Sequence, residues 1–94
     1  MLLVTMAKAK AGTGQERITR RAQWKYPDGM RVLAEYWPIG GEYEAIIISE
    51  GDNITSAMAL FVVAWSDVLD ITITPALTAE EGLRLAQQMH MVKS

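Results

Sequence analysis

The chain has 94 residues, the length of one domain, and half of them are hydrophobic, with a mean hydropathy of +0.08. A net charge of −2 argues against a general nucleic-acid binder, and the absence of cysteine excludes disulfides, thiolate nucleophiles and cysteine metal sites. Because a monomer of this size buries only roughly 60–65% of its unfolded surface, so apolar a composition predicts a homodimer.

The first predicted strand, residues 1–7, is largely apolar on both faces. Side chains alternate along a strand, so one face carries Leu2, Val4 and Met6, and the other carries Leu3, Thr5 and Ala7. A strand of this kind is typical of the interior of a sheet that is covered on both sides.

A helix is predicted from residue 13 to about residue 25, because Thr13 and Glu16 have the spacing of a capping box. Residues 1–31 carry seven basic and two acidic side chains, and much of that charge falls on this helix: Arg17, Arg20, Arg21 and Lys25. We expect these groups mostly to face water. The alternative is an anion-binding site or a charged partner surface, with Arg20 and Arg21 as the candidate anion ligands.

Two strands and a hairpin follow the turn at 27–29. The strand at 30–39 contains Pro38, which cannot donate a backbone hydrogen bond, so it is expected at a sheet edge. Gly40 and Gly41 predict a tight hairpin, because glycine accepts the positive φ angles of such turns. The return strand at 43–50 is apolar in its middle and is expected in the sheet interior.

Residues 51–53 are expected to cap a second helix, whose apolar stripe comprises Ile54, Ala57, Met58, Phe61, Trp65 and Val68. Ala59, Val62 and Val63 lie on the other side, which predicts a helix covered all round. An alternating strand at 70–74 ends at Pro75. Thr78 and Glu81 form a second capping box, which opens a last helix to about residue 91.

The order strand, helix, strand, strand, helix, strand, helix predicts an α+β domain of ferredoxin-like βαββαβ type over residues 1–94, with a C-terminal helix. The first and third strands are expected at its centre. Both crossover helices would cover one sheet face. Apolar residues expected on the other face are Leu3, Leu33, Trp37, Ile46 and Ile48. Two such sheets packed face to face would form a dimeric α+β barrel.

The segments Glu50 to Asn53 and Trp65 to Leu77 resemble the closing pattern of domain-of-unknown-function family 3303. That pattern is an acidic helix entry, Trp-x-Asp-Leu, and an acidic-aromatic strand ending in Pro-Val. The sequence departs from it at Phe61 and Ile71, where the family pattern has tryptophan and an aromatic residue. The resemblance implies a dimeric α+β barrel, a superfamily that includes cofactor-free monooxygenases and muconolactone-isomerase-like proteins. It implies no activity.

Candidate chemistry rests on few residues. Trp24, Tyr36 and Trp65, with the lone His90, are the candidate lining of a small-molecule pocket, although aromatic residues more often fill a core or an interface. Asp67 and Asp70 are the candidate acid–base pair, but both positions suit turn carboxylates bonded to backbone amides. One histidine with scattered carboxylates shows no metal-ligand spacing, so no metal and no cofactor are expected.

Two classes of function follow. The favoured one, because no acid–base pair is convincing, is a homodimeric module that binds a small ligand or a protein partner. The alternative is a cofactor-free, monooxygenase- or isomerase-like enzyme acting on an aromatic or conjugated molecule. We expect a cytoplasmic protein without nucleic-acid or membrane partners, because the N-terminal apolar run is too short for a signal peptide and none reaches transmembrane length.

Overall fold

The computed structural model describes residues 2–51 and 54–93, and side chains at 2–51 and 56–89. The elements in chain order are β1 (Leu2–Ala9), α1 (Gly14–Gln23), β2 (Arg31–Tyr36), β3 (Ala45–Glu50), α2 (Ile54–Trp65), β4 (Leu69–Pro75) and α3 (Ala79–Lys93). The predicted order of elements is confirmed.

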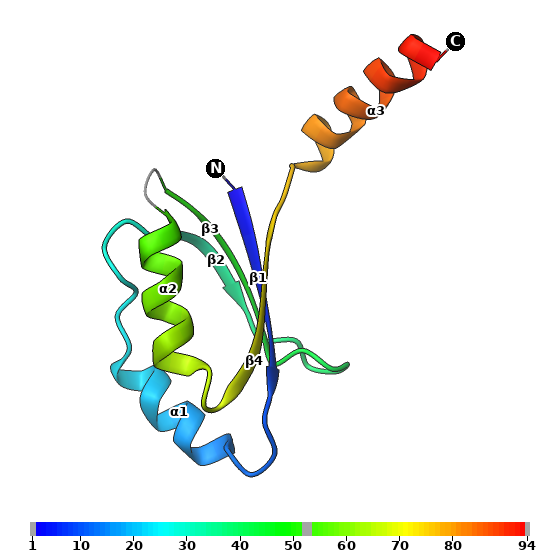
Figure 1. Cartoon of the computed structure of the whole chain (residues 1–94). Helices are drawn as coiled ribbons and strands as arrows, with labels where there is room; N and C mark the ends of the chain where they lie inside the picture. Colours follow the sequence, from blue (N-terminus) through cyan, green and yellow to red (C-terminus); the bar gives the residue numbers. More distant parts are fainter. Residues whose placement is uncertain (1, 52–53, 94) are drawn as a thin grey trace.

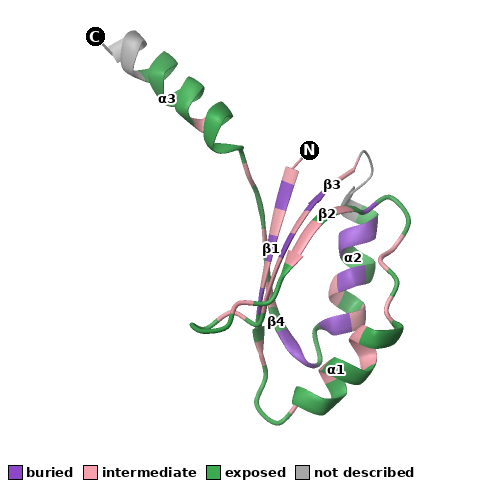
Figure 2. Ribbon diagram, turned by 180° about the vertical axis from the view of Figure 1, so that it is seen from behind, coloured by how far each residue is buried: buried purple, intermediate pink, exposed green. Residues whose placement is uncertain are grey.

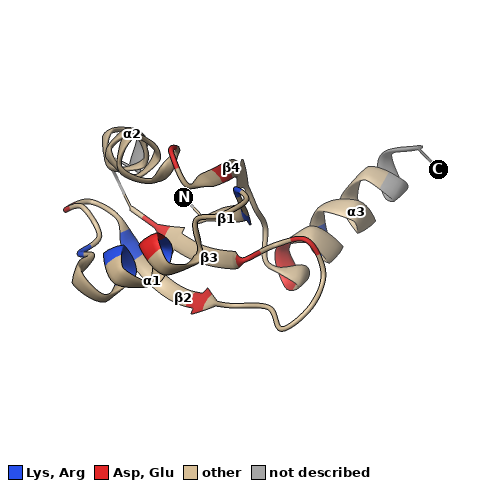
Figure 3. Ribbon diagram, turned by 90° about the horizontal axis from the view of Figure 1, so that it is seen from below, with Lys and Arg blue, Asp and Glu red and all other residues tan. Residues whose placement is uncertain are grey.

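The four strands form one antiparallel sheet in the order β2-β3-β1-β4. The central strands are β1 and β3, as their apolar character predicts, and β2 lies at one edge. Helices α1 and α2 cover the same face of the sheet, and in the described part of the chain no helix lies over the other face (Figures 1 and 3). This arrangement confirms an α+β fold of ferredoxin-like type. We call the uncovered side the open face.

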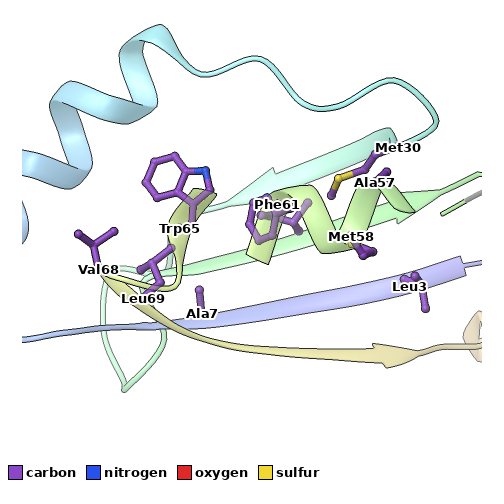
Figure 4. Packing of buried hydrophobic residues seen from close by; sticks show 10 residues of the cluster. Leu3, Ala7, Met30, Ala57, Met58, Phe61, Trp65, Val68 and Leu69 are labelled. Carbon is purple, nitrogen blue, oxygen red and sulfur yellow. The ribbon is translucent and has the colours of Figure 1, made fainter. Parts of the chain in front are cut away.

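The core lies between α2 and the covered face. On β1, Leu3, Thr5 and Ala7 point toward the helices, and Thr5 is paired with Ile47 of β3 and Ile73 of β4. The buried apolar residues, shown in Figure 4, are Leu3, Ala7, Met30, Ile47, Ala57, Met58, Phe61, Trp65, Val68 and Leu69. The side chains of Val4, Met6, Ile46 and Ile48 lie on the open face.

For helix α2, the predicted buried stripe is confirmed, but the predicted burial of its other side is not. Its stripe from Ala57 to Trp65 is buried against the sheet, and Trp65 is only 4% exposed. The expectation that the helix is covered all round is wrong, because Leu60 and Val63 on its outer side are 60% and 79% exposed. Helix α2 packs against the sheet on one side only, so the residues on its outer side remain exposed. The predicted cap at residues 52–53 lies outside the described residues.

Helix α1 differs most from its prediction. It has no buried residue and ends at Gln23. The Thr13 side chain caps no helix amide; its hydroxyl instead donates to the carbonyl oxygen of Lys10 at 2.6 Å. The arginines do not mostly face water, since the side chains of Arg17 and Arg20 are only 19% and 25% exposed. With so few apolar groups, α1 docks through its arginines.

Strands β2 and β3 are shorter than predicted, so residues 37–44 form a loop rather than a tight hairpin. The register between the two strands shifts between Val32 and Ala34, which marks a β-bulge at Leu33. The shift helps turn Glu35 toward the helices. Two residues expected on the open face lie elsewhere. Trp37, just after β2, donates a hydrogen bond to Glu35, and Leu3 of β1 is in the core.

Helix α3 begins with the predicted capping box, because the Thr78 and Glu81 side chains each accept the backbone N–H of the other residue at 3.1 Å. The helix then projects beyond the end of the sheet (Figures 1 and 2). The radius of gyration is consequently 15.9 Å, against about 13 Å for a compact chain of about 100 residues.

Trp65→Ala should remove roughly 3–5 kcal/mol of stability, because it deletes the largest side chain of the core and leaves a cavity. The comparison is a pair of urea melts, with Val63→Ala on the exposed side of the same helix as the control. The control should change stability by no more than about 0.5 kcal/mol. A Trp65→Ala midpoint within error of the parent would contradict this placement of α2.

Candidate functional site

A cavity of about 240 Å³ lies on the covered side of the sheet, between α1, α2 and strands β2 and β3. Its lining is mostly apolar and aromatic: Trp24, Ala45, Ile47, Phe61, Trp65 and Leu69. Figure 4 shows Phe61 and Trp65 on α2 and Leu69 at the start of β4, and all three line the cavity. Apart from Trp24, these apolar lining residues therefore come from β3, from α2 and from the start of β4.

Aromatic rings in edge-to-face contact form much of this lining. The Trp24 ring, just past the end of α1, lies edge-on to Trp65 with centroids 5.7 Å apart and to Phe61 at 6.1 Å. The Tyr26 ring stacks on Phe61, with an interplanar angle of 16°. Such pairs contribute roughly 0.5–1.5 kcal/mol each beyond the burial of their area, so the cluster fixes the chain after α1 against α2.

One carboxylate organises the polar part of the lining. Glu35 on β2 accepts two hydrogen bonds from the Arg21 guanidinium, at 2.7 and 3.0 Å. It also accepts one from the Tyr26 hydroxyl at 2.6 Å and one from the Trp37 indole N–H at 2.8 Å. The Glu35 side chain is only 15% exposed. A carboxylate in so little water needs donors of this kind, and bidentate pairing with arginine is the strongest of them.

These contacts move two pKa values away from neutrality. Hydrogen bonds from Arg21, and then from Tyr26 and Trp37, outweigh burial and lower the pKa of Glu35 to about 2. Burial and the hydrogen bond to Glu35 raise the pKa of the Tyr26 hydroxyl well above its ordinary value. Near neutral pH the pair is therefore a carboxylate with four donors and a protonated phenol. Neither group is poised to exchange protons at that pH.

A second arginine holds α1 to the end of α2. Arg20 donates two hydrogen bonds to the Asp67 carboxylate, at 2.7 and 3.0 Å, and one to the carbonyl oxygen of Ala64 at 2.8 Å. It also bonds to Glu16 at 2.8 Å. The two candidate anion ligands, Arg20 and Arg21, thus each bind carboxylates of their own chain. An external anion would have to compete with those carboxylates.

Three other sequence candidates, Tyr36, Asp67 and Asp70, lie apart from the cavity. Tyr36 does not line it, because Tyr36 follows Glu35 on β2 and is paired with Ile46 on the open face, where it is 61% exposed. The side chain of His90 lies outside the described residues. Asp67 and Asp70 each pair with a different cation, since Lys10 lies 3.8 Å from Asp70. Of the four predicted pocket residues, the structure brings Trp24 and Trp65 together.

Sequence reasoning missed Glu35, Tyr26 and Phe61 as parts of the site. Glu35 and Trp37 are two positions apart on the predicted strand and so share one of its faces, but the other two residues that hold the carboxylate, Tyr26 and Arg21, lie nine and fourteen positions earlier in the chain. Only a stripe of apolar residues on α2 pointed to Phe61, and such a stripe predicts burial rather than a cavity.

Two negative findings apply to the described part of the chain, one on metal binding and one on membrane spans. Among the described side chains, no group of three or more histidine, cysteine or acidic residues could hold a metal ion. Across the described helices, none combines the length and the apolar character needed to cross a membrane.

Glu35→Gln should destabilise the protein at neutral pH, and its stability gap to the parent should narrow as the pH falls from about 4.5 to about 2. The reason is that Glu35 has a folded-state pKa of about 2 against an ordinary value of 4.5. A group with a lowered pKa contributes stability above its unfolded pKa and loses it toward its folded pKa. Urea melts at a series of pH values measure the gap, with the exposed Glu80→Gln as the control. A gap independent of pH would show that Glu35 is not held in this network.

Comparison with known proteins gives a family but no characterised relative. No curated protein and no solved structure matches the chain. A family model described as a domain of unknown function (DUF3303) matches residues 1–90. Because the match covers nearly the whole sequence, the chain belongs to the DUF3303 family.

Proposed function

We propose that this protein is a homodimeric module that binds a small, uncharged aromatic molecule in the cavity beneath α1. The observation that supports this most is the lining itself. Trp24, Phe61 and Trp65 surround a space of about 240 Å³, and Glu35 and Tyr26 add fixed polar groups. An apolar space with a few convergent polar groups is the usual form of a small-molecule site.

Size and charge narrow the kind of ligand. Pockets for drug-sized ligands measure roughly 300–1,000 Å³, so a cavity of about 240 Å³ suits a molecule of one or two rings. The charged groups of the lining are two arginines and two glutamates. Arg21 is paired with Glu35, and Arg17 lies 3.6 Å from Glu44. With its charges paired, the lining favours a neutral ligand over an anion or a cation.

The alternative is a cofactor-free enzyme acting on a similar molecule. Glu35 and Tyr26 place polar groups in the lining, as such an enzyme would require. However, the pKa of Glu35 is about 2 and that of Tyr26 is raised, so neither group takes up or releases a proton readily near neutrality. This protonation state supports binding over proton-transfer catalysis.

The open face supports the homodimer. Val4, Met6, Ile46 and Ile48 lie on it together with Ala34 of β2, so its centre is apolar. Two copies packed through these faces would form the dimeric α+β barrel that the sequence predicts. A specific interface of that kind buries about 1,600 Å² in total, and a four-stranded sheet face offers a broad surface for it.

Indole should bind the parent protein and shift the resonances of the Trp24 and Trp65 side chains in ¹H–¹⁵N spectra, because both rings line the cavity. Ala45→Leu should weaken indole binding at least tenfold, or by about 1.4 kcal/mol, since it fills part of the cavity. Ala59→Leu, the same change on the exposed side of α2, should leave binding unaltered. No shift at millimolar indole, or equal binding by Ala45→Leu, would overturn the proposed site.

Light scattering at micromolar concentration should give twice the mass of the 10.4 kDa chain. Ile48→Glu should lower that mass toward one chain, because it places a charge at the centre of the proposed interface. The mass of a single chain for the parent would contradict the homodimer. It would leave the indole experiment unaffected, since the cavity described above is formed within one chain.

A further inference from the structure

Over its described side chains, residues 79–89, helix α3 presents an apolar side to water. On a helix with 3.6 residues per turn, one side carries Ala79, Gly82, Leu83, Leu85, Ala86 and Met89. The opposite side carries Glu80, Glu81, Arg84, Gln87 and Gln88. Leu83, Leu85 and Met89 are 61%, 47% and 53% exposed. An amphipathic helix of this design normally lies against a partner surface.

The position of α3 indicates where that surface is. The helix follows β4 after three residues, and the first of them is held to the sheet because the amide of Ala76 donates to the carbonyl oxygen of Leu2 at 3.0 Å. From there α3 extends past the sheet on the side away from α1 and α2, which is the side of the open face (Figures 1, 2 and 3). The loop 37–44 projects on the same side (Figures 1 and 3).

An isolated helix of 15 residues is marginally stable in water, and most helices gain their stability by packing an apolar side. The sheet of the same chain does not cover α3, because the helix points away from it (Figure 2). The chain thus carries two uncovered apolar surfaces on one side, the open face and α3. A second copy stacked on the open face would bring its own body within reach of α3.

We infer that α3 is an exchanged arm, which packs its apolar side on the second copy of the chain in the homodimer. The inference rests on the homodimer proposed above and adds a second contact to it. By two-fold symmetry, each copy would give one arm and receive one. The polar side of α3, with Glu80 and Arg84 3.7 Å apart, would remain in solvent.

The first test removes the apolar character of the arm. Leu85→Glu with Met89→Glu should raise the dissociation constant of the dimer at least tenfold, measured by sedimentation equilibrium. Gln87→Glu with Gln88→Glu makes the same change of charge on the polar side and should leave the constant within about twofold. If both double variants dimerise like the parent while Ile48→Glu does not, the arm is wrong and the open-face dimer stands.

The second test does not depend on weakening the dimer. The chain has no cysteine, so Gln88→Cys accepts a single nitroxide spin label. The labelled, unenriched chain is mixed with ¹⁵N-enriched, unlabelled chain. Attenuated resonances in the enriched chain are expected, because the arm of one copy lies on the other. In a second sample the spin-labelled chain is itself ¹⁵N-enriched. Attenuation of sheet resonances in that second sample alone, with none in the mixed sample, would show that α3 folds back on its own sheet. A monomeric parent would remove both this inference and the proposed homodimer.

Discussion

The position of α1, and with it the roof of the cavity, depends on the carboxylate of Glu35. That one group joins α1 through Arg21, the segment after α1 through Tyr26, and the end of β2 through Trp37. Helix α1 has no fully buried residue, so apolar packing by the helix itself contributes little to holding it against the sheet. The second attachment, Arg20 to Asp67, fixes the same helix to the end of α2. Because each attachment is bidentate, the two together fix both the distance and the orientation of α1.

The two faces of the sheet differ in what lies against them. The covered face holds the core and the cavity, and α1 docks over that cavity through the Arg17–Glu44 and Arg21–Glu35 ion pairs. The open face and α3 leave apolar groups in water, as does the outer side of α2 with Leu60 and Val63. A chain of this size has too few elements to cover every apolar surface itself. The proposed assembly with a second copy would cover the open face and α3 together.

Much of the fold could be predicted from local patterns. The two-faced apolar character of β1 and β3 placed them at the sheet centre, and the Thr78–Glu81 capping box marked the start of α3. The errors arose where distant residues decide. Arg20 and Arg21 were expected to face water. Their partners, Asp67 and Glu35, lie 47 and 14 positions away in the chain, so no local pattern indicated these ion pairs. The bulge at Leu33 changed which residues of β2 face the helices, and no residue pattern in the strand predicts this bulge. Of the site, aromatic content pointed to Trp24 and Trp65, whereas the central carboxylate went unnoticed.

The most direct test of this account is a crystal structure of the protein grown with indole. In that structure Glu35 should accept hydrogen bonds from Arg21, Tyr26 and Trp37 beneath a docked α1. A planar ligand should lie in the cavity, against the rings of Trp24 and Trp65. A structure in which the Trp24 ring fills that cavity, with Glu35 turned toward solvent, would contradict both the carboxylate anchor and the proposed binding site.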